Sequence, residues 1–534
     1  MFLKSGKILK SIASSFFLIL PWIEGFEFFF PVSWLFFLHL LDRSNSVRRR
    51  FLWVYVVLVV WNAGVTWWIW NASPGGAVMA ILANAALMCM VLYVFYFFSS
   101  CFSASFSLYA LIPFWMSFEY LHQYWDLSWT WLTLGNMLSG LKEIIGWYKY
   151  TGVSGGTCWI LLVNVSVYNL CKNFNNRNAW IAILTLSCPV LLTYFLSFSN
   201  KGKIYDRTLK YIVVQPNIDP YNEKFYYDFE TLYENTRRMI QSNVSSEKSD
   251  LMVFPETFIT YNLNEEKINH DVVIEQFRKD FIYSGMTKYI LCGASTYCFY
   301  KENEKTSTSR LDKESGLYYD MFNTALWISR DTVMMYHKSI LVPGVEKMPF
   351  PEWFGFLEKF AIDLGGTTGS LGTQKKRTVF ASDEGWKVAP IVCYESVYGE
   401  YVGDYIRKGA DILCVITNDG WWGNTPGHRQ HLRFGSLRCV EYAVPMLRSA
   451  NTGISSVINS KGEIKELLPY QKSGILKGSI SFSAPHSLTF YAKYKDWLSR
   501  IAMISCLGIF VYAFYFSYLK KKSEGKKSYS SLKM

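Results

Sequence analysis

Three residues that could carry out nucleophilic chemistry stand at the ends of predicted β-strands in the middle of the sequence. Each follows directly on an apolar, β-prone run, and the three are Glu256, Lys338 and Cys393. A cysteine becomes a strong nucleophile when a nearby base or positive charge favours its thiolate. A lone cysteine at a strand end is most often an inert core residue, but here a carboxylate and an ammonium end other strands and can meet it at one edge of a sheet. The combination predicts a reactive thiol at Cys393.

These strand ends belong to segment 201–496, which has the mixed composition of a soluble globular domain and is long enough to bury its own core. Runs that favour strands alternate there with amphipathic runs that favour helices, which predicts an α/β domain with a largely buried sheet. The expected strands are Tyr211–Gln215, Leu251–Phe254, Tyr289–Ala294, Thr324–Ile328, Thr332–His337, Val388–Val392, Ile412–Thr417 and Ile454–Ile458. The expected helices are Tyr226–Gln241, Val272–Ser284 and His428–Tyr442.

The rest of the chain is too apolar for an ordinary soluble protein. Of the 534 residues, 51% are hydrophobic and 18% aromatic, and the excess lies in residues 1–200 and 498–519. The formal charge of +12 would suggest nucleic-acid binding, but the basic residues lie mostly in short loops and at the two ends, which indicates membrane topology instead. The 11 cysteines form no C-x-x-C pair and no cluster with zinc spacing, and no phosphate-binding loop occurs, so we expect no metal and no cofactor.

The apolar segments predict an α-helical membrane bundle of about eight spans, because most of them reach the roughly 20 residues that a helix needs to cross hydrocarbon. The first apolar run follows Lys4, Lys7 and Lys10 and lacks a small-residue cleavage site, so we expect an uncleaved first span. The others are expected at Phe26–Leu41, Phe51–Trp70, Ala77–Phe98, Phe102–Leu121, Ser154–Leu170, Ala179–Phe198 and Leu498–Leu519.

Basic residues orient these spans. If the N-terminus is cytoplasmic, the cytoplasmic segments hold nearly all the basic residues of the membrane part, whereas the opposite short loops hold only Lys142 and Lys149. The positive-inside rule then places both termini in the cytoplasm and segment 201–496 on the outer side. The expected domains are a membrane domain 1–200 with about seven helices, an outer catalytic domain 201–496, a C-terminal transmembrane helix 497–519 and a basic cytoplasmic tail 520–534.

The residues around the three strand ends resemble a known catalytic triad. The stretches are Val253-Phe254-Pro255-Glu256-Thr257, Tyr336-His337-Lys338-Ser339 and Cys393-Tyr394-Glu395. In this order they resemble the Glu-Lys-Cys triad of the carbon–nitrogen hydrolase (nitrilase) superfamily, and with the membrane helices included the chain resembles the bacterial apolipoprotein N-acyltransferase family. Further similar stretches are Val214–Asn217, Thr417–Gly423, Gln430-His431, Arg448–Gly453, Thr489–Trp497 and Trp129–Leu132.

The resemblance implies a fold and an activity. The fold is a nitrilase-like αββα sandwich on the periplasmic side of the bacterial inner membrane. The activity is a two-step, ping-pong acyl transfer, in which a fatty acyl chain passes from a membrane phospholipid to a cysteine thioester and then to the α-amino group of the N-terminal S-diacylglyceryl-cysteine of an apolipoprotein. The implied partners are the phospholipid donor, the apolipoprotein acceptor and the lipid bilayer, with no nucleic acid.

The resemblance also implies roles for individual residues. Glu256 would act as general base for Cys393 and later return the proton to the leaving group. Lys338 would favour the thiolate and stabilise the oxyanion of the tetrahedral intermediate together with the backbone N–H of Tyr394. A buried ammonium is costly unless it is paired, so Glu256, Glu346 and Glu395 are expected to supply the opposite charge for Lys338. The supporting residues are the carboxylates Glu346 and Glu395, together with Tyr394 and Trp421.

Two aromatic segments are expected near lipid. The stretch 348–357 exposes too many aromatic residues for a lid that faces water, so we expect an interfacial arm that dips into lipid and gates the acyl chain; packing into a core is the alternative. Its substrate-access residues are Trp353, Phe354 and Phe356. The loop 123–153, on the same outer side, is either an interfacial aromatic belt or a platform on which the outer domain docks or lipid is guided.

Two other functions fit parts of the sequence. A membrane-anchored amidase of the nitrilase type would use the same triad with water as the acceptor, and only the membrane part and its aromatic outer loop argue against it. A transporter with a soluble outer domain is the weaker alternative, because the spans hold few charges and no paired discontinuous helices. Acyl transfer is the function that the sequence favours.

Overall fold

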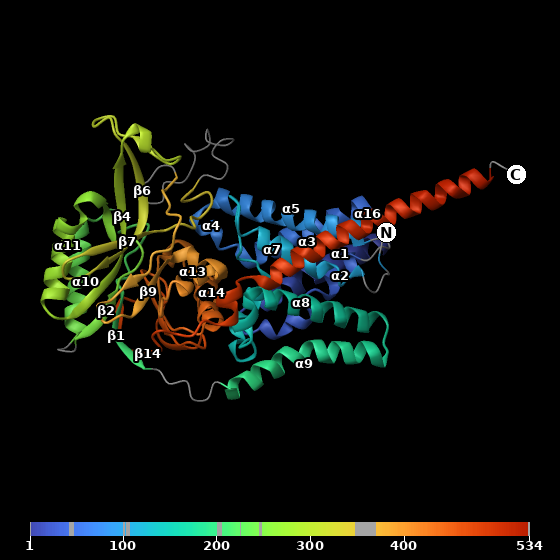
Figure 1. Cartoon of the computed structure of the whole chain (residues 1–534), viewed down its shortest axis with the longest axis horizontal. Coiled ribbons are helices and arrows are strands. Elements are labelled where there is room, and N and C mark those ends of the chain that lie inside the picture. Colours follow the sequence, from blue (N-terminus) through green and yellow to red (C-terminus); the bar gives the residue numbers. More distant parts are fainter. Residues whose placement is uncertain are drawn as a thin grey trace.

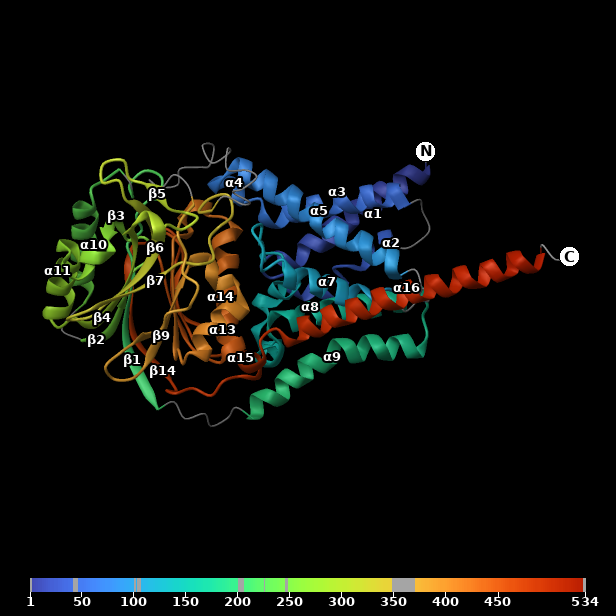
Figure 2. The same cartoon turned by 45° about the horizontal axis from the view of Figure 1, so that its top comes forward.

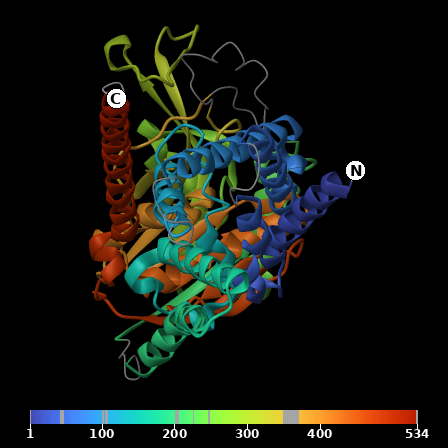
Figure 3. The same ribbon diagram turned by 90° about the vertical axis from the view of Figure 1, so that its right-hand side faces the viewer.

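The computed structural model describes residues 2–41, 47–99, 102, 107–199, 206–224, 226–244, 248–347 and 370–531. The molecule is elongated, with a bundle of helices at one end and a β-rich part at the other (Figure 1). Helix α1 (Phe2–Ile19) begins at the end of the bundle that lies away from the sheets. The C-terminal helix α16 (Trp497–Ser531) extends to this same end (Figures 1 and 2). Seen from that end, α16 stands at the edge of the bundle (Figure 3).

Most expected spans are helical, with shifted ends. The other helices of the bundle are α2 (Leu35–Leu41), α3 (Val47–Thr66), α4 (Ile69–Ala72), α5 (Pro74–Phe98), α7 (Leu111–Leu121), α8 (Tyr148–Lys172) and α9 (Asn176–Ser199). Within the described residues, 4 helical segments are long and apolar enough to cross a membrane, namely Pro74–Phe98, Tyr148–Lys172, Asn176–Leu196 and Trp497–Leu519. Shorter apolar helices are Ile8–Trp22, Glu27–Leu41 and Arg50–Thr66. These helices indicate a membrane protein, while the count of about eight spans stays a prediction.

The expected helix at 26–41 is wrong as a single α-helix. This segment begins as the 3₁₀ helix η2 (Glu27–Val32) with Pro31 inside it, and α2 starts only at Leu35. Proline has no N–H to donate along an α-helix and clashes with the preceding turn, so Pro31 disfavours a continuous α-helix in this segment. The expected helix at 51–70 is likewise divided between α3 and α4, and part of the segment expected at 102–121 lies outside the described residues.

The chain turns sharply between α4 and α5. Ser73 has an extended backbone and its hydroxyl accepts a hydrogen bond from the Gly76 N–H at 3.1 Å, which caps α5. Pro74 follows at the first helical position, where its missing N–H costs nothing. Next to this turn the end of α4 contacts the β-rich part, where Asn71 Nδ2 donates to the Trp422 carbonyl at 2.9 Å.

Two sheets make up the β-rich part. The strands of the first are β1 (Arg207–Gln215), β2 (Ser249–Val253), β3 (Ile259–Asn264), β4 (Thr287–Tyr300), β5 (Arg310–Leu311), β6 (Tyr318–Ile328), β7 (Val333–His337) and β14 (Gly474–Phe482). Those of the second are β8 (Phe380–Ala381), β9 (Lys387–Val392), β10 (Ile412–Thr417), β11 (Met446–Ala450), β12 (Ser455–Ile458) and β13 (Ile464–Leu468). The first has the order β14-β1-β2-β4-β6-β5, with β3 beside β4 and β7 beside β6, and the second has the order β13-β12-β11-β10-β9-β8. Strands β1, β2 and β4 are parallel, as are β9, β10 and β11.

Side-chain alternation determines how the layers pack. Along β1, Tyr211 and Val213 lie in the core cluster that includes the second sheet, whereas Ile212 and Val214 lie in a separate cluster with helical residues. Strand side chains alternate between the two faces, so the sheets pack against each other and helices cover their outer faces. The covering helices are α10 (Phe229–Asn243) and α11 (Val272–Phe277) on the first sheet, and α13 (Gly399–Arg407) and α14 (Pro426–Tyr442) on the second. Helix α14 lies between its sheet and the bundle (Figure 2). This is the expected nitrilase-like α/β sandwich.

Every strand expected from the sequence is present, with ends that differ by a few residues. The sequence pattern did not predict β3, β5, β8, β13 or β14, which are short strands or strands with exposed polar residues, nor β11, which is buried but contains the polar residues Arg448 and Ser449. The helix expected at 272–284 changes after Phe277 into a π-helical turn, Arg278–Tyr283.

Candidate active site

Cys393 stands at a sharp turn between β9 and the short 3₁₀ helix η10 (Cys393–Val397). Its backbone φ is +50°, which is uncommon for a residue other than glycine. The turn is bonded internally, because the Val392 N–H donates to Glu395 Oε2 at 2.9 Å and Ser396 Oγ donates to the Cys393 carbonyl at 2.8 Å. Unusual backbone angles persist where the surroundings hold them, often at functional sites. The strand end predicted at Cys393 is therefore a tightly bonded turn.

Glu395 joins this turn to the strand end that carries Lys338. Its carboxylate is fully buried, and Oε1 accepts hydrogen bonds from the Ser339 N–H at 2.7 Å and from the Tyr336 hydroxyl at 2.6 Å. A buried carboxylate is stable when several donors satisfy it. The expectation that Glu395 balances the charge of Lys338 is wrong, because its oxygens are directed to the backbone of both strand ends. Glu395 supports the site by holding these two ends together.

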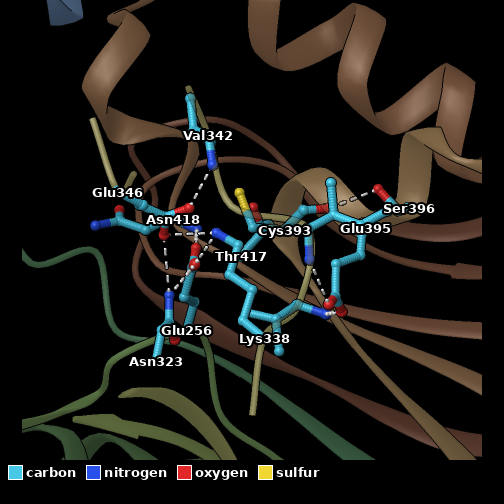
Figure 4. A network of polar contacts seen from close by, with 12 residues as sticks. Glu256, Asn323, Lys338, Val342, Glu346, Cys393, Glu395, Ser396, Thr417 and Asn418 are labelled. Atoms are coloured by element: carbon cyan, nitrogen blue, oxygen red, sulfur yellow. Dashed lines mark hydrogen bonds and ion pairs between the residues drawn. The ribbon is translucent and has the colours of Figure 1, made fainter. Parts of the chain in front are cut away.

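Glu256, Lys338 and Glu346 form one hydrogen-bonded cluster (Figure 4). Lys338 Nζ lies 3.0 Å from Glu256 Oε1 and 2.8 Å from Glu346 Oε1. Backbone donors hold the second oxygen of each carboxylate. The Asn418 N–H donates to Glu256 Oε2 at 3.0 Å, and the Val342 N–H donates to Glu346 Oε2 at 2.9 Å. The two carboxylates and the ammonium are thus fixed by the fold, not by flexible contacts with each other alone.

The charges of this cluster follow from burial and pairing. Burial alone would raise the pKa of Glu256, but Lys338 and Asn323 outweigh it and the pKa lies below its ordinary value. Burial would lower the pKa of Lys338, but the neighbouring carboxylates outweigh it and the pKa is raised. For Cys393, burial and then the charge of Glu256 raise the thiol pKa by more than Lys338 lowers it. The resting site therefore holds a carboxylate, an ammonium and a neutral thiol, so the thiol needs a base at the moment of attack.

These groups open onto one cavity of about 180 Å³, whose walls come from both ends of the molecule. From the β-rich part it is lined by Lys224, Glu256, Asn323, Lys338, Glu346, Cys393, Tyr394, Asn418, Trp421 and Trp422, among others. From the helical part it is lined by Trp68, Ile69, Ala72, Ser73, Trp129 and Trp131. An apolar wall with a few convergent polar groups is typical of a small-molecule site. In the parts of the chain that the structure describes, no group of His, Cys, Asp and Glu side chains could hold a metal ion.

The aromatic loop 123–153 contacts the β-rich part directly. Trp131 is fully buried, and its Nε1 donates to Gln430 Oε1 at 2.8 Å. Trp68, which directly precedes α4, donates from Nε1 to the same oxygen at 3.3 Å. Of the two alternatives for this loop, these contacts favour the docking platform.

The other predicted site residues lie as follows. The ring of Tyr394 is buried, with its centroid 6.1 Å from that of Trp129, and its hydroxyl accepts a hydrogen bond from Tyr398 at 3.1 Å. Trp421 lines the cavity, and its carbonyl accepts from the Tyr221 hydroxyl at 2.9 Å. The predicted lipid-access residues Trp353, Phe354 and Phe356 lie outside the described residues.

Three residues of the site were not predicted from the sequence. Asn323 lies within β6 and donates from Nδ2 to Glu256 Oε1 at 2.8 Å. Lys224 is buried, and its Nζ donates to the Glu256 carbonyl at 3.3 Å; burial lowers its pKa to about 8, although nearby negative groups offset part of the effect. Asn418 directly follows the predicted strand 412–417, so its position at a strand end was the signal that could have identified it.

Known proteins of one enzyme family match both the helical and the β-rich part of this chain. The family model for carbon–nitrogen hydrolases matches residues 213–484, and the model for the N-terminal domain of apolipoprotein N-acyltransferases matches residues 14–166. An apolipoprotein N-acyltransferase of Chlorobaculum tepidum is 27% identical over 497 residues, which cover 90% of each chain. One of Geobacter metallireducens is 26% identical over 496 residues, covering 87% of this chain and 88% of that protein. Since the first model spans more than half of the sequence, the chain belongs to the carbon–nitrogen hydrolase family, and it carries the N-terminal domain of the apolipoprotein N-acyltransferases.

Proposed function

We propose that this chain is an apolipoprotein N-acyltransferase, which moves a fatty acyl chain from a membrane phospholipid, through a thioester on Cys393, to the α-amino group of an S-diacylglyceryl-cysteine. The observation that carries the proposal is the shared cavity, in which Glu256, Lys338 and Cys393 face walls built by the helical part. A hydrolase of small soluble amides has no need of such walls. The relatives that match both parts of the chain bear the name of this activity and support the proposal.

In the first half-reaction, Glu256 takes the thiol proton of Cys393 while the sulfur attacks the ester carbonyl carbon of the donor. Negative charge collects on the carbonyl oxygen, where Lys338 and the Tyr394 N–H stabilise it. Tyr394 is the second residue of η10, and the first N–H groups of a helix have no acceptor within it. The ester C–O bond then breaks, Glu256 gives its proton to the departing alkoxide, and the acyl chain remains as a thioester.

In the second half-reaction, the amine of the acceptor attacks the thioester carbonyl and gives a proton to Glu256. The C–S bond breaks, the thiolate of Cys393 recovers the proton from Glu256, and the N-acylated product leaves. Water in place of the amine would hydrolyse the thioester. The tryptophan walls contributed by Trp68 and Trp131 favour the lipid-bearing acceptor over water because they exclude water from the thioester.

Glu346 keeps Lys338 paired through both half-reactions. When Glu256 is protonated it no longer balances the charge of Lys338, and an unpaired ammonium in a buried site is costly. Glu346 Oε1 lies 2.8 Å from Lys338 Nζ and keeps its own backbone partner, so the ammonium retains one carboxylate at every step. The second carboxylate therefore allows Glu256 to cycle between its two protonation states.

The proposal includes a location. Residues 201–496 form the catalytic domain on the periplasmic side of the bacterial inner membrane, residues 1–200 and 497–519 form the membrane domain of about eight spans, and residues 520–534 form a cytoplasmic tail. The asymmetry of basic residues supports this orientation. The position of both chain ends at the same end of the bundle, away from the sheets, also supports it (Figure 1).

A mass spectrum of the full-length protein in phospholipid vesicles tests the proposal. We expect an acyl adduct on the peptide that contains Cys393, and its loss when a diacylglyceryl-cysteine peptide is added and becomes N-acylated. Cys393→Ser should insert but form no adduct, while Cys414→Ser, at a buried cysteine of β10, should behave as the wild type. Turnover retained in Cys393→Ala would contradict the proposal. Release of free fatty acid in the presence of the acceptor would favour the amidase-type alternative.

A further inference from the structure

A chain of buried polar side chains ends on the backbone of the nucleophile. Arg448 Nη2 donates to Asp419 Oδ2 at 2.5 Å, and Asp419 Oδ1 lies 2.9 Å from His431 Nδ1. The other ring nitrogen of His431, Nε2, lies 3.1 Å from the carbonyl oxygen of Cys393. All three side chains are fully buried. None of them belongs to the Glu256 cluster, and the acyl-transfer steps derived above leave them without a role.

The contacts determine what His431 does. A carbonyl oxygen only accepts hydrogen bonds, so the contact with Cys393 is attractive when Nε2 carries the hydrogen. Nδ1 faces both Asp419 Oδ1 and the donor Arg448 Nη2, which lies 3.1 Å from it. Burial would raise the pKa of Asp419, but Arg448 and then His431 outweigh it and lower the pKa, so the carboxylate beside Nδ1 is ionised. Ser396 Oγ lies 3.0 Å from Nε2 and donates to the same carbonyl at 2.8 Å. The Cys393 carbonyl therefore accepts from two buried donors.

This carbonyl and the Tyr394 N–H belong to the same planar peptide group. A hydrogen bond at the carbonyl therefore fixes the direction of the N–H at the other end of the group. It also polarises the group, which strengthens the hydrogen bond that the N–H donates. The backbone φ of +50° at Cys393 is in a sparsely populated region, so this peptide plane needs contacts that hold it in place.

We infer that His431, oriented by Asp419 and Arg448, is a positioning residue that sets the peptide plane between Cys393 and Tyr394 for oxyanion stabilisation. The inference rests on the proposed acyl transfer and adds a residue that acts through the backbone of the nucleophile. The competing explanation is packing alone, since the ring of His431 lies 5.9 Å from Trp131 and 5.5 Å from Trp422, centroid to centroid.

Two substitutions distinguish the hydrogen bonds made by the two ring nitrogens of His431. In His431→Gln the amide nitrogen can occupy the place of Nε2 and donate to the Cys393 carbonyl, whereas in His431→Asn it reaches only the place of Nδ1 and donates to Asp419. Two reactions separate oxyanion formation from thiol reactivity. Acylation of Cys393 by a p-nitrophenyl ester passes through a tetrahedral oxyanion, whereas alkylation by iodoacetamide is a displacement at a saturated carbon and forms none.

With the full-length protein we expect His431→Asn to slow acylation by about 10- to 100-fold, less than the loss of a whole oxyanion donor because the Tyr394 N–H remains. Its alkylation rate should change by less than about threefold, because the thiol and Glu256 are untouched. His431→Gln should keep acylation within about fivefold of the wild type. The matched control is His486→Gln. His486 lies outside the site, but its Nδ1 also faces a buried aspartate, with Asp411 Oδ1 at 3.4 Å. The rates of acylation and alkylation should both be unchanged in this variant.

Equal losses of acylation and alkylation in His431→Asn would assign His431 a merely structural role and overturn the inference. So would a His431→Gln variant that is as slow in acylation as His431→Asn, because the Nε2 donor would then not matter. A wild-type protein that is not acylated at Cys393 would refute the proposed function and this inference with it. Normal wild-type acylation together with an unaffected His431→Asn would refute this inference alone.

Discussion

Replacing Glu256 by glutamine should separate proton transfer from thiol activation. A neutral glutamine can neither take the thiol proton nor deliver one to a leaving group. It also removes a negative charge that, after burial, contributes to the raised pKa of Cys393. Lys338 then faces the thiol with Glu346 as its remaining carboxylate. The pKa of Cys393 should therefore fall, and the thiolate should be more populated at neutral pH than in the wild type.

The effect on rate then depends on the leaving group. A p-nitrophenolate departs without a proton, whereas the alkoxide of a phospholipid needs one. Loss of a general acid–base residue costs about 10²- to 10⁴-fold, so we expect acylation from phospholipid to fall by that factor and acylation by a p-nitrophenyl ester to fall by less than about tenfold. The glutamine NH₂ must face either the Asn418 N–H or the donors of Lys338 and Asn323. This donor–donor conflict should lower the free energy of unfolding by about 1–3 kcal/mol.

Both acylation rates are measured on one preparation, from released p-nitrophenol and from the mass of the adduct on Cys393, and thermal unfolding gives the stability. Glu466→Gln is the matched control, because Glu466 accepts a hydrogen bond from Tyr211 at 2.9 Å in the edge strand β13, outside the site. If Glu256→Gln slowed both acylations by the same factor, Glu256 would not protonate the leaving group. If it slowed neither, another residue would be the base.

Three further predictions follow from the same contacts. The pKa of Lys224 is lowered from 10.5 to about 8 in the folded protein, so the unfolded chain binds more protons between these pH values. The stability of the wild type should therefore rise from pH 8 to 10.5 relative to that of Lys224→Met. Melting temperatures that change with pH by the same amount in both proteins would contradict this. Gln430→Leu removes the acceptor shared by Trp68 and Trp131, so the free energy of unfolding should fall by about 1–3 kcal/mol, and an unchanged melting temperature would argue against the shared bond. In intact cells whose periplasm is accessible, an impermeant lysine reagent should label segment 201–496 and spare the C-terminal tail; a labelled tail would reverse the proposed orientation.

The sequence predicts the reactive strand ends because β-prone runs stop abruptly at Glu256, Lys338 and Cys393. It could not predict Asn323, since a polar residue within a strand faces the site only through the register of that strand with its neighbours. Nor could it predict what Glu395 does, because the donors around a buried carboxylate are brought together by the fold. Residue type and position on a strand are local properties, whereas these partners are set by tertiary structure.

The same distinction holds in the helical part. Apolar length predicts α5, α8, α9 and α16 well, because the length of an apolar run is a local property. Pro31 interrupts a run that hydropathy alone treats as continuous. Trp68 resembles an interfacial anchor when only its neighbours in the sequence are considered. Its hydrogen bond to Gln430 joins residues 362 positions apart, which no local pattern can reveal.

The cavity wall built by the helical part constrains how this enzyme can change. Trp68 and Trp131, which attach the helical part to the β-rich part through hydrogen bonds to Gln430, also line the cavity next to Cys393. A substitution of either tryptophan that enlarges the cavity for a bulkier acyl chain therefore weakens the contact between the helical part and the β-rich part. A substitution that strengthens this contact makes the cavity smaller. The preference for acyl-chain size and the strength of the contact between the two parts therefore change together. Variants selected for a new acyl donor should carry compensating substitutions on α14.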